Sequence, residues 1–413
     1  MNRYVFIPGK NPNLSLAELA SWYDLQGLYF RVAVQEKEFL ILEAEKAPEA
    51  DSLGGMIKVC RLLESFDRKP ERISENIFDS LPASDLPKSR MFGLSVYPDS
   101  SSNNRLFNHY ATSLKDSLRE AGIYGKFMPV PKDRSALTHV EVIKKKLEEV
   151  VVCMDNKRVH VAKTLTVHNP FDFQKRDMDR PKKRPMYSIP PRLAKIMVNI
   201  SRQKESRLLL DPFCGIGTIL QEAALFDLDI MGSDIDEQCC LDAIENLYWL
   251  SQDYKLGLSG LDKKIMKLDA TRLSNTFNSE SIDLIVTEPF LGPALKIYPD
   301  QRKAESILRG LKTFFQKSLM EFSFVLKKGG RMCMVFPRFE FGEHFTHLDA
   351  QKMAAKAGLK PVNILGKYRI PGSFPYVDKE PRHKTIREIW VFEKPLSEKP
   401  MPKPPVDLAM EKA

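Results

Sequence analysis

A short glycine-containing segment, Asp-Pro-Phe-Cys-Gly-Ile-Gly-Thr at 211–218, has the residue types of a ligand-binding loop. It follows an apolar strand predicted at 208–210 and leads directly into a predicted helix. Its two glycines let the backbone turn tightly and approach a ligand closely. The free N–H groups that open the helix suit a carboxylate or a phosphate. We therefore predict a cofactor loop, with contacts from Asp211, Phe213, Gly215, Gly217 and Thr218.

The spacing within this loop argues against a dinucleotide. A dinucleotide fingerprint needs a third glycine three residues after the second, and position 220 is Leu. The segment resembles the first motif of class I methyltransferases, especially those that act on amino groups of nucleic acids. That resemblance implies S-adenosylmethionine (SAM) as the cofactor, whose methionine part ends in a carboxylate.

Two acidic positions agree with a SAM site. Asp234 ends the next predicted strand, about 20 residues beyond the glycines, where a carboxylate can accept both ribose hydroxyls. A helix N-cap is the alternative role, but Asp236 can fill it. Asp269 follows a weak strand at 265–268, and an acid at this point of the class receives the adenine amino group. Ile235 and Ala270 follow these two acids and are the remaining predicted cofactor contacts.

A candidate catalytic motif ends the strand predicted at 283–287. It reads Thr-Glu-Pro-Phe-Leu-Gly over 287–292, where the amino methyltransferases that it resembles carry D/N-P-P-Y/F. An exocyclic amine is conjugated with its ring and is a poor nucleophile. A side-chain oxygen and a backbone carbonyl can accept its N–H groups, an aromatic face can stack on the base, and positioning then supplies much of the rate.

The motif departs from that pattern, and two alignments remain open. If the aromatic residues are aligned, Phe290 matches the tyrosine and Thr287 takes the position of the acid. If the flanking Thr and Gly are aligned, Glu288 replaces the acid before Pro289, Phe290 replaces the second proline and Leu291 takes the aromatic position. We prefer the second alignment because it has no gap and keeps a carboxylate. A site that binds SAM but has altered or lost chemistry is the alternative.

The elements that must position these residues alternate between strand and helix from residue 187 onward. Short apolar strands separated by helices indicate βαβ units and a mostly parallel sheet. We therefore predict an α/β, Rossmann-like methyltransferase domain over 187–395. Its strands are predicted at 208–210, 229–233, 283–287, 331–336 and 386–392, with helices that include 237–250 and 304–326.

The first 168 residues predict two smaller α+β units. Residues 1–85 combine short strands with a helix at 14–27, and we expect a ferredoxin-like domain. Residues 86–168 contain an amphipathic helix at 106–121 and a hairpin that ends near 166. The last residues, 396–413, are rich in Pro and Lys and are expected to be disordered.

A polar linker at 169–186 is broken by prolines. Six of the ten residues from 175 to 184 are basic, so this stretch is a candidate for RNA phosphate contacts. A solvated hinge is the alternative. The basic residues are Lys175, Arg176, Arg180, Lys182, Lys183 and Arg184.

Several segments together resemble one family, the archaeal tRNA guanine-10 N2-methyltransferases and their eukaryotic relatives. The resemblance implies a THUMP-like RNA-binding domain over 86–168, a tRNA substrate and a target base flipped out of its stack. An rRNA or DNA amino methyltransferase, or a noncatalytic RNA-binding protein that retains a SAM fold, remains the alternative. The segments are Tyr4–Leu19, Ser135–Leu147, Val159–Thr166, Arg176-Asp177 with Arg180-Pro181, and Ile189–Asn199.

Composition sets further bounds on the 413 residues. The net charge of +9 and the pI of about 9.0 favour a polyanionic partner. Six cysteines without a CxxC pair argue against a zinc site and a disulfide framework, so we expect no metal. No apolar run reaches the roughly 18 residues that span a bilayer. We expect a cytoplasmic protein without membrane contact, and a monomer.

Overall fold

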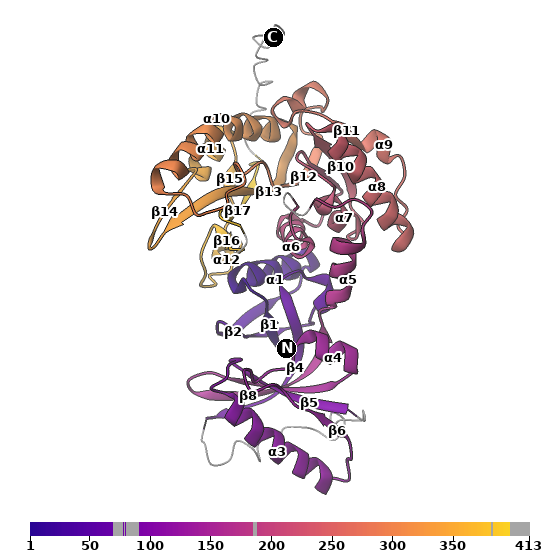
Figure 1. Ribbon diagram of the computed structural model, residues 1–413, viewed down its shortest axis with the longest axis vertical. Coiled ribbons are helices and arrows are strands. Elements are labelled where there is room, and N and C mark those ends of the chain that lie inside the picture. The colour runs from indigo at the N-terminus through magenta and orange to yellow at the C-terminus, as the bar shows by residue number, and fades with distance from the viewer. Residues whose placement is uncertain (69–76, 78, 80–90, 185–187, 381–382, 397–413) are drawn as a thin grey trace. The chain divides into compact units, whose positions relative to one another are not determined.

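The computed structural model describes residues 1–68, 77, 79, 91–184, 188–380 and 383–396. Its contacts divide the chain into two compact units. The first contains Met1–Leu19 and Gln26–Phe173, and the second contains Ala20–Leu25 and the chain from Gln174 onward. Each unit has one β-sheet (Figure 1). The tail predicted to be disordered lies, from 397 on, outside the described residues.

The first unit is built on a sheet with the strand order β2-β3-β1-β4-β8-β7-β5-β6. Neighbouring strands are antiparallel, except that β5 runs parallel to β6 and to β7. β4 pairs with β8 along most of its length, so one continuous sheet runs through both predicted N-terminal units. The division into 1–85 and 86–168 stays a prediction. The strands are β1 (Asn2–Pro8), β2 (Phe30–Gln35), β3 (Leu40–Ala44), β4 (Met56–Asp67), β5 (Met91–Tyr97), β6 (Lys126–Met128), β7 (Glu148–Met154) and β8 (Arg158–Val167).

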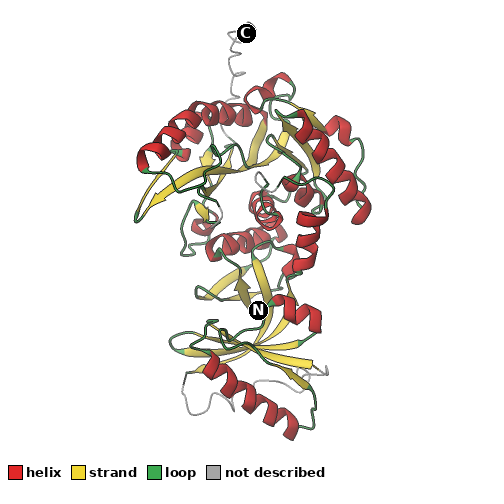
Figure 2. Cartoon of the chain, viewed as in Figure 1, coloured by secondary structure: helices red, strands yellow, loops and turns green. Residues whose placement is uncertain are grey.

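Helices pack on this sheet through single apolar faces. In α3 (Asn104–Glu120), Phe107, Tyr110, Ala111 and Leu114 are buried at the spacing of one helix face, and Figure 2 shows this helix alongside the strands. A capping box between Thr138 and Glu141 fixes the start of the next helix. The other helices of this part are α1 (Pro12–Gln26), the 3₁₀ turn η1 (Ala50–Ser52), α4 (His139–Lys145) and α5 (Pro170–Gln174).

The second unit has a nine-stranded sheet whose main order is β11-β10-β9-β12-β13-β17-β15. The strands from β11 to β13 are parallel, and β17 is antiparallel to β13 and to β15. The strand order reverses between β9 and β12, and such switch points are where open α/β sheets bind ligands. The strands are β9 (Leu208–Asp211), β10 (Asp229–Asp234), β11 (Ile265–Lys267), β12 (Ile282–Thr287), β13 (Leu326–Phe341), β14 (His344–His347), β15 (Lys360–Pro361), β16 (Tyr376–Asp378) and β17 (Ile386–Glu393).

Helices cover both faces of the second sheet. Figure 1 shows α10 and α11 on one side of the sheet and α6 on the other. The prediction of a Rossmann-like domain preceded by an α+β part is confirmed by this order of elements. In the part of the chain that is described, no helix has both the length and the apolarity needed to cross a bilayer. The helices are the π-helical turn η3 (Lys175–Asp179), α6 (Pro191–Ser201), α7 (Thr218–Ala224), α8 (Glu237–Asp253), α9 (Leu261–Lys264), the 3₁₀ segment η4 (Ala270–Asn275), α10 (Gln301–Val325), α11 (Ala350–Lys356) and α12 (Ile364–Lys367).

Candidate active site

The predicted cofactor loop connects β9 to α7 at the switch point of the sheet. Gly215 and Gly217 have φ angles of +51° and +85°, which glycine adopts without strain. A Cβ atom on Gly217 would lie 3.2 Å from the Cβ of Ala243, so this glycine permits close packing against α8. Beside Gly215 a Cβ would meet nothing within 4 Å. One side of the loop is thus packed, and the other faces open space that a ligand can occupy.

Asp234 lies next to this loop at the end of β10. Its Oδ2 accepts a hydrogen bond of 2.9 Å from the backbone N–H of Gly215, and its Oδ1 accepts one of 3.0 Å from that of Asp236. A carboxylate has about four acceptor sites, so both oxygens can still accept a hydroxyl. Asp236 is the N-cap of α8, as the sequence suggested. The neighbouring Ile235 is 69% exposed, which leaves its side chain available to an adjacent ligand.

Asp269 follows β11, the next strand in the sheet. Its Oδ1 accepts hydrogen bonds of 2.8 Å from the backbone N–H and from the hydroxyl of Thr271. The other oxygen of the carboxylate takes part in neither bond and has the acceptor character that an adenine amino group needs. Ala270 is 3% exposed and belongs to the core behind this acid.

Asp211 is buried at the end of β9 and is bound by the candidate catalytic motif. Thr287 donates a hydrogen bond of 2.7 Å from Oγ1 to Oδ1 of Asp211, and the N–H of Phe213 donates to the same oxygen over 3.1 Å. Burial raises the pKa of Asp211 to about 7, although both hydrogen bonds lower it. The hydroxyl of Thr287 is therefore engaged with the cofactor loop, in a side chain that is fully buried.

Two other predicted cofactor contacts have protein partners. The ring of Phe213 packs edge-on against Phe314, with centroids 5.5 Å apart, and against Phe322. Thr218 is 4% exposed, and its hydroxyl accepts a hydrogen bond of 2.7 Å from Arg180. These contacts hold the loop in place, and a direct contact of either side chain with SAM stays a prediction.

Glu288 forms an ion pair that the sequence does not reveal. Its Oε1 accepts a hydrogen bond of 2.6 Å from Nε of Arg387, and its Oε2 lies 3.4 Å from Nη2. Arg387 is on β17, far along the chain, and also approaches Asp378. The sequence analysis missed Arg387 and Asp378 because no local motif marks them.

The rest of the motif divides into a buried and an exposed part. Pro289 is buried, whereas Phe290 is 56% exposed. Leu291, which takes the aromatic position in the preferred alignment, is partly buried and packs against the hydrophobic core of the second unit. The exposed ring available for stacking on a base is therefore that of Phe290, while the carboxylate is that of Glu288.

The linker is folded onto the second unit through buried arginines. Nε of Arg176 donates a hydrogen bond of 2.6 Å to Glu222 of α7, and both side chains are at most 1% exposed. Arg180 is 2% exposed and binds Thr218 and Ser188. A buried guanidinium with protein partners cannot reach an RNA phosphate in this conformation. The predicted phosphate contacts of Arg176 and Arg180 are thus replaced by contacts that anchor the linker.

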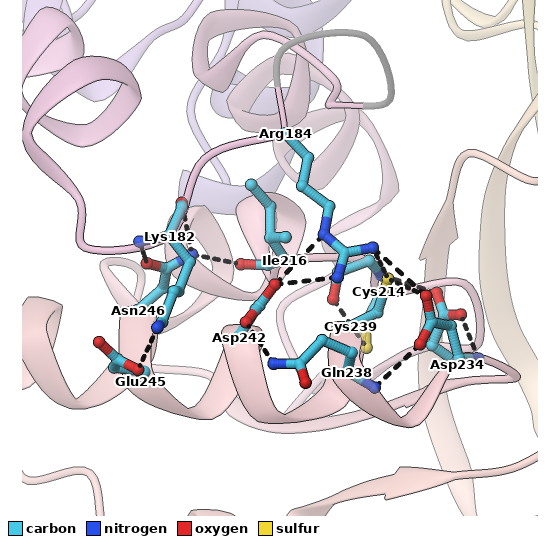
Figure 3. Close-up of polar contacts among 12 residues, drawn as sticks. Lys182, Arg184, Cys214, Ile216, Asp234, Gln238, Cys239, Asp242, Glu245 and Asn246 are labelled. Atoms are coloured by element: carbon cyan, nitrogen blue, oxygen red, sulfur yellow. Dashed lines mark hydrogen bonds and ion pairs between the residues drawn. The ribbon is translucent and has the colours of Figure 1, made fainter.

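Further along the linker, two basic residues dock on α8 (Figure 3). Arg184 reaches Asp242 over 3.1 Å and Asp236 over 3.3 Å. The backbone N–H of Lys182 donates to Asn246, whose amide in turn donates to the carbonyl of Ile216 in the cofactor loop. The buried Asn246 therefore connects the linker to the cofactor loop, in addition to the bond between Arg180 and Thr218.

The outer side chains of the linker remain candidates for RNA phosphates. Lys175 pairs with Asp253 over 2.6 Å, and Lys182 pairs with Glu245 over 3.1 Å, but both lysine side chains are at least 40% exposed. Lys183 is exposed as well. Exposed ion pairs are weak and exchange readily, so phosphate contact by these three lysines stays a proposal.

Metal-binding side chains do not gather in the described part of the chain. No group of three His, Cys, Asp or Glu residues there has the arrangement of a metal site. All six cysteines are free.

Part of the second unit is similar to a known family. Residues 181–364 match the model of the UPF0020 family, described as an RMKL-like methyltransferase domain. This range contains the cofactor loop, Asp234, Asp269 and the Thr-Glu-Pro-Phe-Leu-Gly motif. Arg387 lies beyond the matched range.

Relatives of similar sequence include two groups of guanine methyltransferases. The chain is 33% identical over 187 residues to the tRNA (guanine(10)-N2)-dimethyltransferase of Methanothermobacter thermautotrophicus, which covers 45% of this chain and 49% of that relative. It is 29% identical over 158 residues to the U6 snRNA (guanine-N(2))-methyltransferase THUMPD2 of Mus musculus, which covers 38% of this chain and 25% of that protein. The chain thus spans about half or less of the length of these curated relatives.

Solved structures share the fold along nearly the whole chain. TrmN from Thermus thermophilus superposes with a TM-score of 0.55 at 16% identity, over 95% of this chain and 99% of that one. A possible methylase from Clostridium difficile 630 gives 0.50 at 17% identity, over 98% and 100%. Within this fold, residues 181–364 are the part that is similar to the UPF0020 family of RMKL-like methyltransferase domains.

Proposed function

We propose that this chain is a SAM-dependent RNA methyltransferase that methylates N2 of a guanine in tRNA, at a site of the position-10 type. One observation carries the proposal. The cofactor loop, Asp234 and the Thr287–Gly292 motif all lie at the carboxyl ends of adjacent parallel strands, β9, β10 and β12. The names of the curated relatives, which are guanine N2-methyltransferases, support the choice of base.

The residues at this edge have the chemistry that the reaction needs. SAM supplies a methyl group that is already activated. The open face beside Gly215 gives its methionine part room, Asp234 accepts the ribose hydroxyls, and Asp269 accepts the adenine amino group. Glu288 accepts a hydrogen bond from the guanine amino group, and Phe290 stacks on the base. Catalysis then rests on orientation of the amine.

The RNA substrate is supported by charge and by the first unit. The chain carries a net charge of +9, which favours a polyanion. The first unit is an α+β sheet that we propose to bind RNA as a THUMP-like domain. Exposed lysines of the linker, among them Lys183, add further candidates for phosphate contact.

Methyl transfer from labelled SAM to defined RNAs tests the function. The purified chain is incubated with a tRNA transcript carrying guanine at position 10, with the same transcript carrying adenine there, with a U6 RNA and with duplex DNA. Nuclease digestion and mass spectrometry identify the product. We expect N2-methylguanosine in the first transcript and no incorporation in the second.

Each other outcome changes the proposal in a defined way. Product in U6 RNA alone would replace the tRNA substrate, and product in DNA alone would replace the substrate class. SAM binding without transfer to any of these RNAs would favour a binding protein that retains the fold. No SAM binding would overturn the assignment of the cofactor loop.

A further inference from the structure

Arg387 lies on β17 with its side chain turned toward the candidate catalytic motif. In the sheet it is opposite Asp378 of β16 and Pro337 of β13. Its guanidinium donates to both oxygens of Glu288, through Nε at 2.6 Å and Nη2 at 3.4 Å. The Arg387 side chain is 6% exposed, whereas that of Glu288 is 14% exposed. The arginine is therefore almost fully buried against the carboxylate, whereas the Glu288 side chain keeps some exposed surface.

We infer that Arg387 is a positioning residue that holds the Glu288 carboxylate at the edge where the guanine amine is oriented. The inference rests on the proposed function and names a residue outside the matched methyltransferase domain. Arg387 touches neither cofactor nor substrate in this role. It acts through Glu288 alone.

The geometry suits a fixed acceptor. A guanidinium binds a carboxylate as a planar fork, which defines its orientation as well as its distance. Each carboxylate oxygen keeps a second acceptor site after the fork has formed. Nη1 of Arg387 lies 3.7 Å from Asp378, so a second acid balances the arginine from the neighbouring strand. Burial lowers the pKa of Arg387, but the charges of Glu288 and Asp378 outweigh it and the pKa is raised.

The pair also explains a departure from the usual motif. The methyltransferases that the motif resembles carry Asp or Asn where this chain has Glu288, which is one methylene longer. In this structure the longer side chain reaches Arg387. An aspartate at 288 would be too short to keep the 2.6 Å contact without a shift of the strand end. Restoring the usual residue should therefore impair this enzyme.

Steady-state kinetics with the full chain test the inference. Arg387→Met removes the fork but keeps an unbranched apolar stem. We expect kcat for tRNA methylation to fall about 100-fold, the cost of a displacement near 1 Å in a reacting group. Affinity for SAM, measured by calorimetry, should remain close to wild type. The kcat of Arg387→Lys should lie between those of wild type and Arg387→Met, because lysine keeps the charge and loses the fork. The kcat of Glu288→Asp should also be lower than that of wild type.

A matched control separates this effect from loss of an ion pair in the sheet. Arg331 of β13 pairs with Glu393 at the other end of β17, over 3.0 Å. Arg331→Met breaks a cross-strand pair between the same two strands, away from Glu288. We expect it to lower thermal stability slightly and to leave kcat close to wild type.

A double-mutant cycle decides whether Arg387 works through Glu288. In a Glu288→Ala background, Arg387→Met should cause no further loss of kcat. An additional loss of similar size would overturn the inference, as would a Glu288→Asp variant as active as wild type. If wild type itself transfers no methyl group, the proposed function fails. The positioning role of Arg387 is then tested on the reaction that wild type does catalyse. It is overturned if a folded Arg387→Met variant catalyses that reaction as fast as wild type.

Discussion

Thr287, the last residue of β12, donates a hydrogen bond of 2.7 Å from its Oγ1 to Oδ1 of Asp211, the last residue of β9. The two residues are 76 positions apart in sequence and lie on adjacent parallel strands. The bond therefore joins the start of the cofactor loop to the start of the candidate catalytic motif. The cofactor loop and the candidate catalytic motif both leave the sheet at its switch point, and the buried bond between Thr287 and Asp211 fixes their relative position.

Removal of this contact should cost stability. Thr287→Val has the same shape but lacks the donor, so the buried Asp211 keeps only the N–H of Phe213. We expect the free energy of unfolding to fall by about 1–3 kcal/mol, the cost of a buried group that loses its partner. Urea denaturation measures it. Thr313→Val on the exposed surface of α10 is the control and should change little. Equal stability of the two variants would contradict the prediction.

The pH dependence of stability should carry a contribution from Asp211. Burial raises its pKa to about 7 in the folded chain, from 3.8. Between these values the folded state binds a proton that the unfolded state has lost, so this contribution falls as the pH rises from about 4 to about 7. At about 1.4 kcal/mol for each pKa unit, the full loss is a few kcal/mol.

Asp211→Asn isolates that contribution. Both hydrogen bonds end on Oδ1, which an asparagine amide also offers, so the contacts can remain while the titration is removed. Thermal melts of both proteins should diverge as the pH rises from 4 to 7, with the variant becoming relatively more stable. A constant difference in melting temperature across this range would show that Asp211 does not titrate there.

Much of the second unit could be predicted from the sequence because its signals are local. The strands expected at 208–210 and 229–233 correspond to β9 and β10, and the helix expected at 237–250 corresponds to α8. A buried parallel strand is recognised in the sequence as a short apolar run, and a tight turn is recognised by its glycine. Asp236 was recognised as a cap for the same reason, since N-caps are set by adjacent residues.

The contacts that complete the site could not be predicted, because they join residues that are distant in sequence. Arg387 follows Glu288 by 99 positions, and an arginine within a strand carries no signal of its partner. The linker arginines were misleading for a related reason. Arg176 and Arg180 lie in a segment with the composition of a phosphate-binding strip. Only their burial against α7 shows that they anchor the linker and do not contact RNA phosphates from solvent.

Cofactor affinity should depend on Asp234. Asp234→Ala removes the acceptor for the N–H of Gly215 as well as the proposed partner of the ribose. Hydrogen bonds to charged groups contribute about 1.5–3 kcal/mol, so affinity for SAM should fall by roughly 10–100-fold. Calorimetry with SAM measures the loss. Asp229→Asn at the exposed start of the same strand is the matched control, and similar affinities for both variants would remove Asp234 from the cofactor site.

The anchoring of the linker should rest on the buried pair of Arg176 and Glu222. Arg176→Met removes the arginine that pairs with Glu222 inside the protein, where both side chains are at most 1% exposed. We expect a loss of about 3–5 kcal/mol in the free energy of unfolding, the usual cost of breaking a buried ion pair from one side. The double variant Arg176→Met with Glu222→Leu removes both charges and should recover much of this loss. Lys175 is the residue before Arg176 and forms an exposed pair with Asp253. Lys175→Met should lower the free energy of unfolding by no more than about 1 kcal/mol. If Arg176→Met costs as little as Lys175→Met in urea denaturation, the linker is not anchored by its arginine and must be held by its backbone contacts to α8.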